Sequence, residues 1–261
     1  MSKPTSVPSW HLETVVRLAD DALILGQRVA QWCGHGPALE EDLAMANIGL
    51  DLIGQARMLY THAGILEGAG RDEDHFAYFR TSSEFRNHSL TELPNGNGPH
   101  DDYATTITKN WLHSARMVPV WQHLAESSDQ QLAAIAMKAV KEATGHLRHA
   151  RDWVVRFGDG TEESHQRMQT ALNKLWPYTN ELFADDAIDQ EAASNQIAPL
   201  PSSVKPEFDK EVAIILAEAT LSQPAPTQFL STGKQGQHTE HLDLILAEMQ
   251  SLARAHPGAT W

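Results

Sequence analysis

The sequence of 261 residues contains a single cysteine, Cys33, and this scarcity excludes two kinds of stabilising site. One cysteine cannot form a disulfide within the chain, and it cannot supply the thiolate cluster that a zinc or iron–sulfur site needs. No run approaches about eighteen apolar residues, which excludes a membrane-spanning helix. The first ten residues, MSKPTSVPSW, also lack the apolar core of a signal peptide. We therefore expect a cytoplasmic protein that does not contact a membrane.

Basic residues are also in short supply. The chain has 20 Lys and Arg against 34 Asp and Glu, a formal net charge of −14. Binding to a phosphate backbone depends on a basic surface, so nucleic acid is excluded as a partner. The glycine-rich stretch STGKQGQ at residues 231–237 lacks the full spacing of a nucleotide-binding loop and follows no strand. No G-x-S-x-G or H-E-x-x-H motif is present, so two common hydrolase sites are absent as well.

No segment alternates apolar and polar residues as a strand does, and helical periodicity takes its place. Residues 39–60 carry apolar side chains at spacings of three and four around most of the circumference, which predicts a helix packed on several sides. Four long helices are predicted, and they pair into two hairpins joined by a long connection. They cover residues 10–33, 39–67, 101–127 and 129–157. This arrangement is typical of an all-α, ferritin-like four-helix bundle, here with additional C-terminal helices in a single domain over residues 1–261.

Shorter features are predicted between and after the hairpins. Residues 72–85 should form one or two short helices, with Ser82 or Ser83 as a cap. The Asn-Gly and Pro pattern of residues 93–99 predicts a loop. Residues 184–203 are acidic and punctuated by proline, which predicts a long surface connection.

The polar residues of the central helix predict where a functional site would lie. Asn47, Asp51 and Gln55 follow one another at i, i+4 and i+8, and packing on both sides would bury them together. On the second helix of the second hairpin, over residues 129–157, Glu142 and His146 share a face. We predict that these five residues form a buried polar network.

A ferritin-like di-iron site needs more ligands than these. It takes one Glu from each of two helices and a Glu-x-x-His pair from each of the other two. Gly54 stands three residues after Asp51, and Gln55 stands in the neighbouring register, so neither register supplies an imidazole. The first helix offers only Asp20 and Asp21. The sequence thus predicts the scaffold without its metal centre, and no metal or cofactor on this chain.

Several stretches closely resemble the C subunits of the bacterial phenylacetyl-CoA epoxidases. The similarity runs in order from about residue 17 to the C-terminus. The stretches are QRVAQWCGHGPALEEDLAMANIGLDLIGQARMLY, ELPNGN, KEATGHLRHARDW, MQTALNKLWPYTNELF and GKQGQHTEHLDLILAEMQ.

The resemblance implies a ferritin-like protein that takes no direct part in catalysis. It pairs with a related catalytic A subunit, which holds the di-iron centre. Together with a small B subunit and a reductase E subunit, the complex converts phenylacetyl-CoA to its ring 1,2-epoxide with oxygen and NADPH. The flavin and iron–sulfur groups belong to the reductase. The C subunit is implied to be structural in this hetero-oligomer of aerobic phenylacetate catabolism.

Other interpretations stay open at this point. The chain could be a metal-binding oxygenase in its own right, with Asp51, Glu142 and His146 as ligands, or a homodimer without a catalytic role. His238 and His241, three residues apart, could also share a metal at the start of the last helix, although such positions often serve as helix caps. Iron content distinguishes the oxygenase from the structural protein, and co-purification with partner proteins tests the homodimer.

Overall fold

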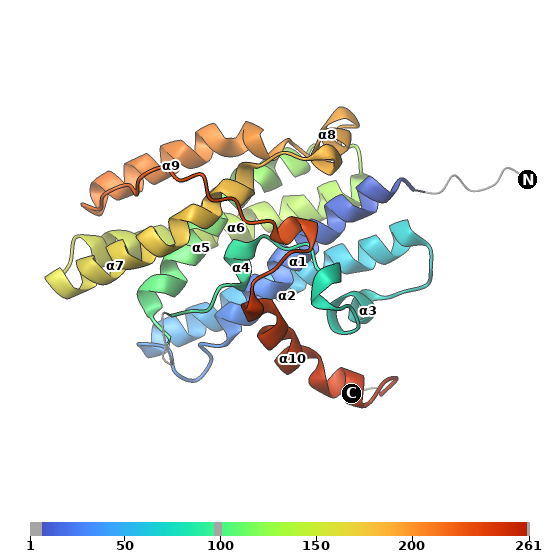
Figure 1. Cartoon of the computed structure of the whole chain (residues 1–261), viewed down its shortest axis with the longest axis horizontal. Coiled ribbons are helices and arrows are strands. Elements are labelled where there is room, and N and C mark those ends of the chain that lie inside the picture. The colour runs from blue at the N-terminus through green and yellow to red at the C-terminus, as the bar shows by residue number, and fades with distance from the viewer. Residues whose placement is uncertain (1–6, 97–100, 260–261) are drawn as a thin grey trace, which may run out of the picture.

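The fold is built from helices and connecting turns (Figure 1). The computed structural model describes residues 7–96 and 101–259, which form ten α-helices and four 3₁₀ helices. In these ranges the only extended pairing is an isolated bridge between Thr232 and Gln237. The predicted all-α, ferritin-like fold is confirmed. None of the described helices is long and apolar enough to cross a lipid bilayer.

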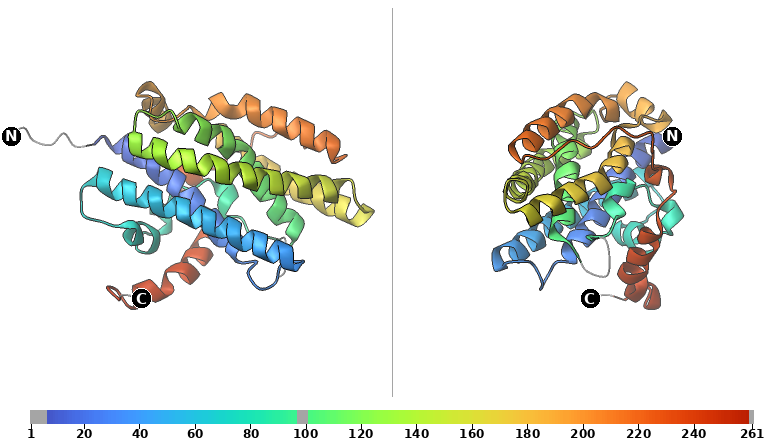
Figure 2. Two further views of the ribbon diagram at one scale, coloured as in Figure 1. Left: turned by 180° about the vertical axis from the view of Figure 1, so that it is seen from behind. Right: turned by 60° about the vertical axis from the view of Figure 1, so that its left-hand side comes forward.

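Four long helices form the centre of the molecule. They are α1 (Ser9–Ala30), α2 (Leu39–Glu67), α5 (Tyr103–Leu124) and α6 (Gln130–Gly158). Helix α1 packs along α2, α5 packs along α6, and α2 joins the two hairpins by contacting α6. Figure 2 shows α2 and α6 side by side across the face opposite to that of Figure 1. A continuous cluster of buried apolar residues, with Trp111 and Trp121 among its largest side chains, fills the space between these helices and their neighbours.

Local signals in the sequence set the ends of the central helices. The Asp129 side chain accepts hydrogen bonds from the amides of Gln131 and Leu132, both at 3.0 Å, and so caps α6. Asp102 caps α5 in the same way through the Ala104 amide. Gly68 ends α2 with a left-handed φ of 69°, a conformation that glycine adopts without a steric penalty.

The remaining helices surround this bundle. The α-helices are α3 (Glu73–Tyr78), α4 (Ser89–Glu92), α7 (Glu162–Leu175), α8 (Ala187–Ser194), α9 (Lys205–Glu218) and α10 (Glu240–Ala255), and the 3₁₀ helices are η1 (Ser82–Glu84), η2 (Trp176–Phe183), η3 (Pro201–Val204) and η4 (Gly233–Gln235). Helices α7 and α9 pack on α5 and α6, α8 packs on α1, and α10 contacts α3 and α4. The additional C-terminal helices are therefore present, and they leave the outer side of α2 uncovered (Figure 2).

Two local predictions were wrong. The caps in residues 72–85 are Asp72, whose side chain accepts from the His75 amide, and Thr81, which directly precedes η1; neither Ser82 nor Ser83 is the cap. Residues 184–203 do not form a plain surface connection, because they contain α8 and are tied to α1 by ion pairs. The predicted loop is non-helical over residues 93–96, and its residues 97–99 lie outside the described ranges.

Candidate functional site

Two polar pairs connect α2 to α6, and they involve four of the five residues predicted to form a network. The Gln55 Nε2 atom donates to Glu142 Oε2 at 2.9 Å. One turn away, His146 Nε2 lies 3.0 Å from Asp51 Oδ2. These contacts bridge the two hairpins through α2 and α6.

Asn47 does not join them, because its side chain is exposed. An α-helix turns about 100° per residue, so each step of four residues drifts about 40° around the axis. Between positions 47 and 55 the line therefore rotates about 80°, from the solvent side of α2 to its packed side. The prediction for Asn47 was wrong for this geometric reason.

Gly54 also lies on the solvent side of α2, so a metal ligand at this position would not point into the bundle as the sequence suggests. A Cβ atom built at Gly54 would meet nothing within 4 Å, so this position faces open space. An imidazole at position 54 would not enter the bundle. Gln55, which is buried, occupies the inward position of this turn instead.

The two pairs differ in their exposure to solvent. The Asp51 side chain is 43% exposed, whereas the His146 side chain is 8% exposed. Burial lowers the pKa of His146, and its hydrogen bond to Asp51 only partly opposes this effect. Glu142 also pairs with Lys138 at 3.3 Å, so its charge is shared with a cation on its own helix. The set is a partly solvated contact between helices, and its carboxylates already have partners.

Two fully buried carboxylates lie on α1, and each is neutralised by groups around it. Asp20 accepts hydrogen bonds from the Tyr60 hydroxyl at 2.5 Å and from the Arg80 guanidinium at 2.5 Å. It also accepts from the backbone amide of Arg86 at 2.7 Å. Helix α2 and the segment after α3 are thus joined to α1 through one carboxylate.

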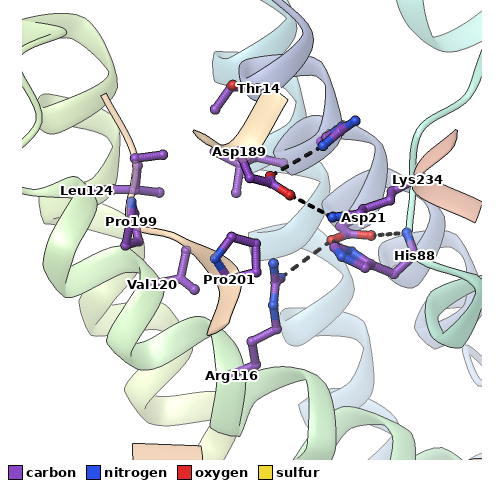
Figure 3. Close-up of a pocket in the computed structure, with 13 residues that line it drawn as sticks. Thr14, Asp21, His88, Arg116, Val120, Leu124, Asp189, Pro199, Pro201 and Lys234 are labelled. Carbon is purple, nitrogen blue, oxygen red and sulfur yellow. Dashed lines mark hydrogen bonds and ion pairs between the residues drawn. The ribbon is translucent and has the colours of Figure 1, made fainter. Parts of the chain in front are cut away.

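Asp21 is held by a histidine and an arginine (Figure 3). Its two oxygens accept from the His88 amide and from His88 Nδ1, both at 2.7 Å, and Arg116 Nη1 lies 3.8 Å away. Burial alone would raise the pKa of Asp21, but the electrostatic interaction and hydrogen bond with His88, together with the charge of Arg116, outweigh it and hold the pKa at about 2. Asp21 is therefore an anion at neutral pH.

A small cavity of about 50 Å³ lies beside Asp21. A second ionic group borders it, in which Lys234 from η4 pairs with Asp189 from α8 at 2.7 Å and Asp189 also contacts Arg17 (Figure 3). Sites for drug-sized ligands and cofactors usually have volumes of about 300–1,000 Å³. This cavity is too small for a coenzyme or an aromatic substrate.

His113 on α5 is buried close to Asp21 and Arg116. Burial lowers the pKa of His113 to about 4, with Arg116, His88 and His146 lowering it further and Asp21 opposing them. Its Nδ1 atom has no hydrogen-bond partner among the described residues. His113 is therefore neutral at pH 7 in an environment that disfavours its protonation.

A cluster of two histidines and one aspartate was not predicted from the sequence. His11, His62 and Asp129 meet where α1 begins, α2 approaches its end and α6 begins. The distances from Asp129 Oδ2 to the Nε2 atoms of His11 and His62 are 2.8 and 2.6 Å. Burial would raise the pKa of Asp129, but hydrogen bonds from His62, the Leu132 amide and His11 lower it well below its usual range.

The ligand atoms of this cluster lie close together, unlike those of the ligand sets that the sequence suggests. Within residues 7–96 and 101–259, the cluster at His11, His62 and Asp129 is the one group of three or more His, Cys, Asp or Glu ligand atoms within 4.8 Å of one another. Asp51, Glu142 and His146 do not converge in this way. Both ring nitrogens of His238 are engaged, by Glu92 Oε2 at 2.7 Å and by the Phe85 carbonyl oxygen at 3.0 Å.

Comparison with known proteins identifies a family and a relative of this chain. The family model described as phenylacetic acid catabolic protein matches residues 2–261. The chain is also 48% identical over 246 residues to the C subunit of the 1,2-phenylacetyl-CoA epoxidase of Escherichia coli (strain K12). That alignment covers 94% of this chain and 97% of the relative.

Proposed function

This chain belongs to the phenylacetic acid catabolic protein family, and on that premise we propose that it is a structural, non-catalytic subunit of a 1,2-phenylacetyl-CoA epoxidase. It pairs with and stabilises a related catalytic A subunit, and it works with a small B subunit and a reductase E subunit. The di-iron centre belongs to the catalytic subunit, and NADPH, flavin and iron–sulfur groups belong to the reductase. This chain holds none of them.

The main support for the proposal is that the buried carboxylates inside the bundle already have partners. Two bridged iron ions need about four carboxylates and two imidazoles that project inward from the four helices. In the described part of α1, α2, α5 and α6, the fully buried carboxylates are Asp20 and Asp21. Arg80 pairs with the first carboxylate, and Arg116 lies 3.8 Å from the second, which also accepts hydrogen bonds from His88. Cations therefore occupy the positions next to these oxygens, and the residues do not fit a di-iron centre.

The outer face of α2 supports pairing with another helical protein. Large apolar side chains are exposed along this helix, where monomeric proteins usually keep such residues apart. They are Leu39, Leu43, Leu50 and Ile65. Gly54 lies on the same helix with open space beside it, which allows a partner helix to approach closely. We name this surface the α2 face, and the pairs between α2 and α6 hold the helix in place behind it.

Co-purification with the catalytic subunit tests the proposal. Leu50 on α2 and Leu244 on α10 are both 67% exposed, so they make a matched pair. Leu50→Glu places a charge on the α2 face and should reduce the amount of catalytic subunit retained at least tenfold, a loss of about 1.4 kcal/mol in binding. Leu244→Glu should retain the catalytic subunit as the wild type does.

Two results would contradict the proposal at different points. If wild-type chain co-expressed with the catalytic subunit retains none of it, the pairing itself is wrong. If Leu50→Glu and Leu244→Glu retain it equally, the catalytic subunit docks elsewhere. Light scattering on the chain alone completes the test, since a stable homodimer through the α2 face would favour the free-standing alternative.

A further inference from the structure

Three ligand-type side chains meet at one end of the bundle, drawn from segments that are far apart in the sequence. His11 comes from the first turn of α1, His62 from the last two turns of α2, and Asp129 from the N-cap of α6. Both imidazoles direct their Nε2 atoms at the same oxygen, Asp129 Oδ2, at 2.8 and 2.6 Å. The three side chains are largely shielded, with 15%, 7% and 6% of their surfaces exposed.

The surrounding residues fix this geometry in advance. Asp129 Oδ1 is already used by the amides of Gln131 and Leu132, which leaves Oδ2 free to serve the imidazoles. The Asp129 amide donates to Ser127 Oγ at 3.1 Å, which holds the backbone of the cap. On the other side, the Trp10 ring stacks on His11 with centroids 5.6 Å apart. Hydrogen bonds of this kind behind a carboxylate orient it in metal sites.

We propose that His11, His62 and Asp129 form a site for a divalent transition-metal ion, with zinc as the best fit. Imidazole nitrogen and carboxylate oxygen are both preferred zinc ligands, at about 2.0–2.2 Å. In a tetrahedral site such bonds separate the ligand atoms by about 3.3 Å. The observed 2.6 and 2.8 Å would therefore widen by about 0.7 and 0.5 Å on binding the ion. Three protein ligands leave a fourth position for water.

The bound ion would join three helices at one point. No disulfide within the chain can join these helices, because the chain has only one cysteine. Zinc would replace two hydrogen bonds by three coordination bonds and fix α1 and α2 to the start of α6. The inference does not depend on the proposed function, since it concerns residues outside the α2 face and outside the pairs between α2 and α6.

Zinc binding by the whole chain tests the site. The protein is purified without a polyhistidine tag, stripped with a chelator and titrated with zinc by calorimetry. The wild type should bind one zinc ion per chain, and its melting temperature should rise with zinc. His62→Gln should weaken binding at least a hundredfold. His75→Gln is the matched control, because His75 is an imidazole on α3 outside this cluster, and it should bind as the wild type does.

Cobalt supplies a second readout that does not depend on stability. Co²⁺ in a four-coordinate site gives visible absorption bands, which should appear in the wild type and in His75→Gln but not in His62→Gln. Equal zinc affinity in the wild type and in His62→Gln would overturn the site. Absence of one-to-one zinc binding in the folded wild type would overturn it as well, and the three residues would then be a hydrogen-bonded cluster only.

Discussion

Replacing His113 by leucine should change how stability depends on pH. His113 is buried on α5, and its Nδ1 atom has no partner in the described structure, so a leucine of similar volume removes no hydrogen bond from that atom. The folded protein lowers the pKa of His113 from 6.5 to about 4, chiefly by burial. Between these values the unfolded chain binds a proton that the folded chain does not.

The sign and size follow from linkage. Because the unfolded state binds more protons in this window, the wild type loses stability as the pH falls from about 6.5 towards 4. One pKa unit corresponds to about 1.4 kcal/mol, so the shift of His113 costs the wild type about 2 kcal/mol by pH 5 and about 3 kcal/mol by pH 4. His113→Leu has no such cost, and its stability relative to the wild type should rise by these amounts.

Urea unfolding followed by circular dichroism measures the difference. Both proteins are unfolded at pH 7, 6 and 5, and the free energies of unfolding are compared at each pH. Other titrating groups are present in both proteins, so their contributions largely cancel in the comparison. A difference between the two proteins that stays constant from pH 7 to pH 5 would refute the reasoning, because it would mean that His113 titrates normally in the folded chain.

Two further predictions concern the packing of the bundle. Arg80→Met leaves the buried Asp20 carboxylate without its cation and should cost about 3–5 kcal/mol in urea unfolding, whereas a cost below about 1 kcal/mol would show that the pair is not buried. A Cβ at Gly64 would collide with the Arg71 carbonyl oxygen, so Gly64→Ala should destabilise the chain by about 1–3 kcal/mol. Gly54→Ala on the same helix meets open space and should stabilise the isolated chain by up to about 1 kcal/mol, and equal effects at the two positions would contradict the packing described.

The long helices were predictable because their signals are local. Asp129 and Gly68 are adjacent to the helices that they begin and end, and the apolar spacing of α1, α5 and α6 repeats over many turns. The orientation of α2 was harder to predict. Apolar residues surround this helix, so the pattern does not identify its packed side. For this reason the pattern predicts an interior position for Asn47 and an inward one for Gly54, although both face outward.

Contacts between distant segments could not be predicted from the sequence alone. Asp189 belongs to an acidic stretch punctuated by proline, and nothing in that stretch indicates that Arg17 and Lys234 will surround it. His11 and His62 lie on different helices and have no motif spacing to Asp129. Only the topology, which brings the start of α1 to the end of α2, reveals that cluster.

The iron content of the chain tests the central claim, that this protein supports the fold of the complex while the di-iron centre belongs to its partner. The chain is expressed alone under iron-replete conditions and measured by plasma emission, as wild type and as His62→Gln. The variant removes any contribution from the proposed zinc site. The account predicts iron well below one atom per chain in His62→Gln. Two iron atoms per chain in that variant would contradict it and make this protein an oxygenase in its own right.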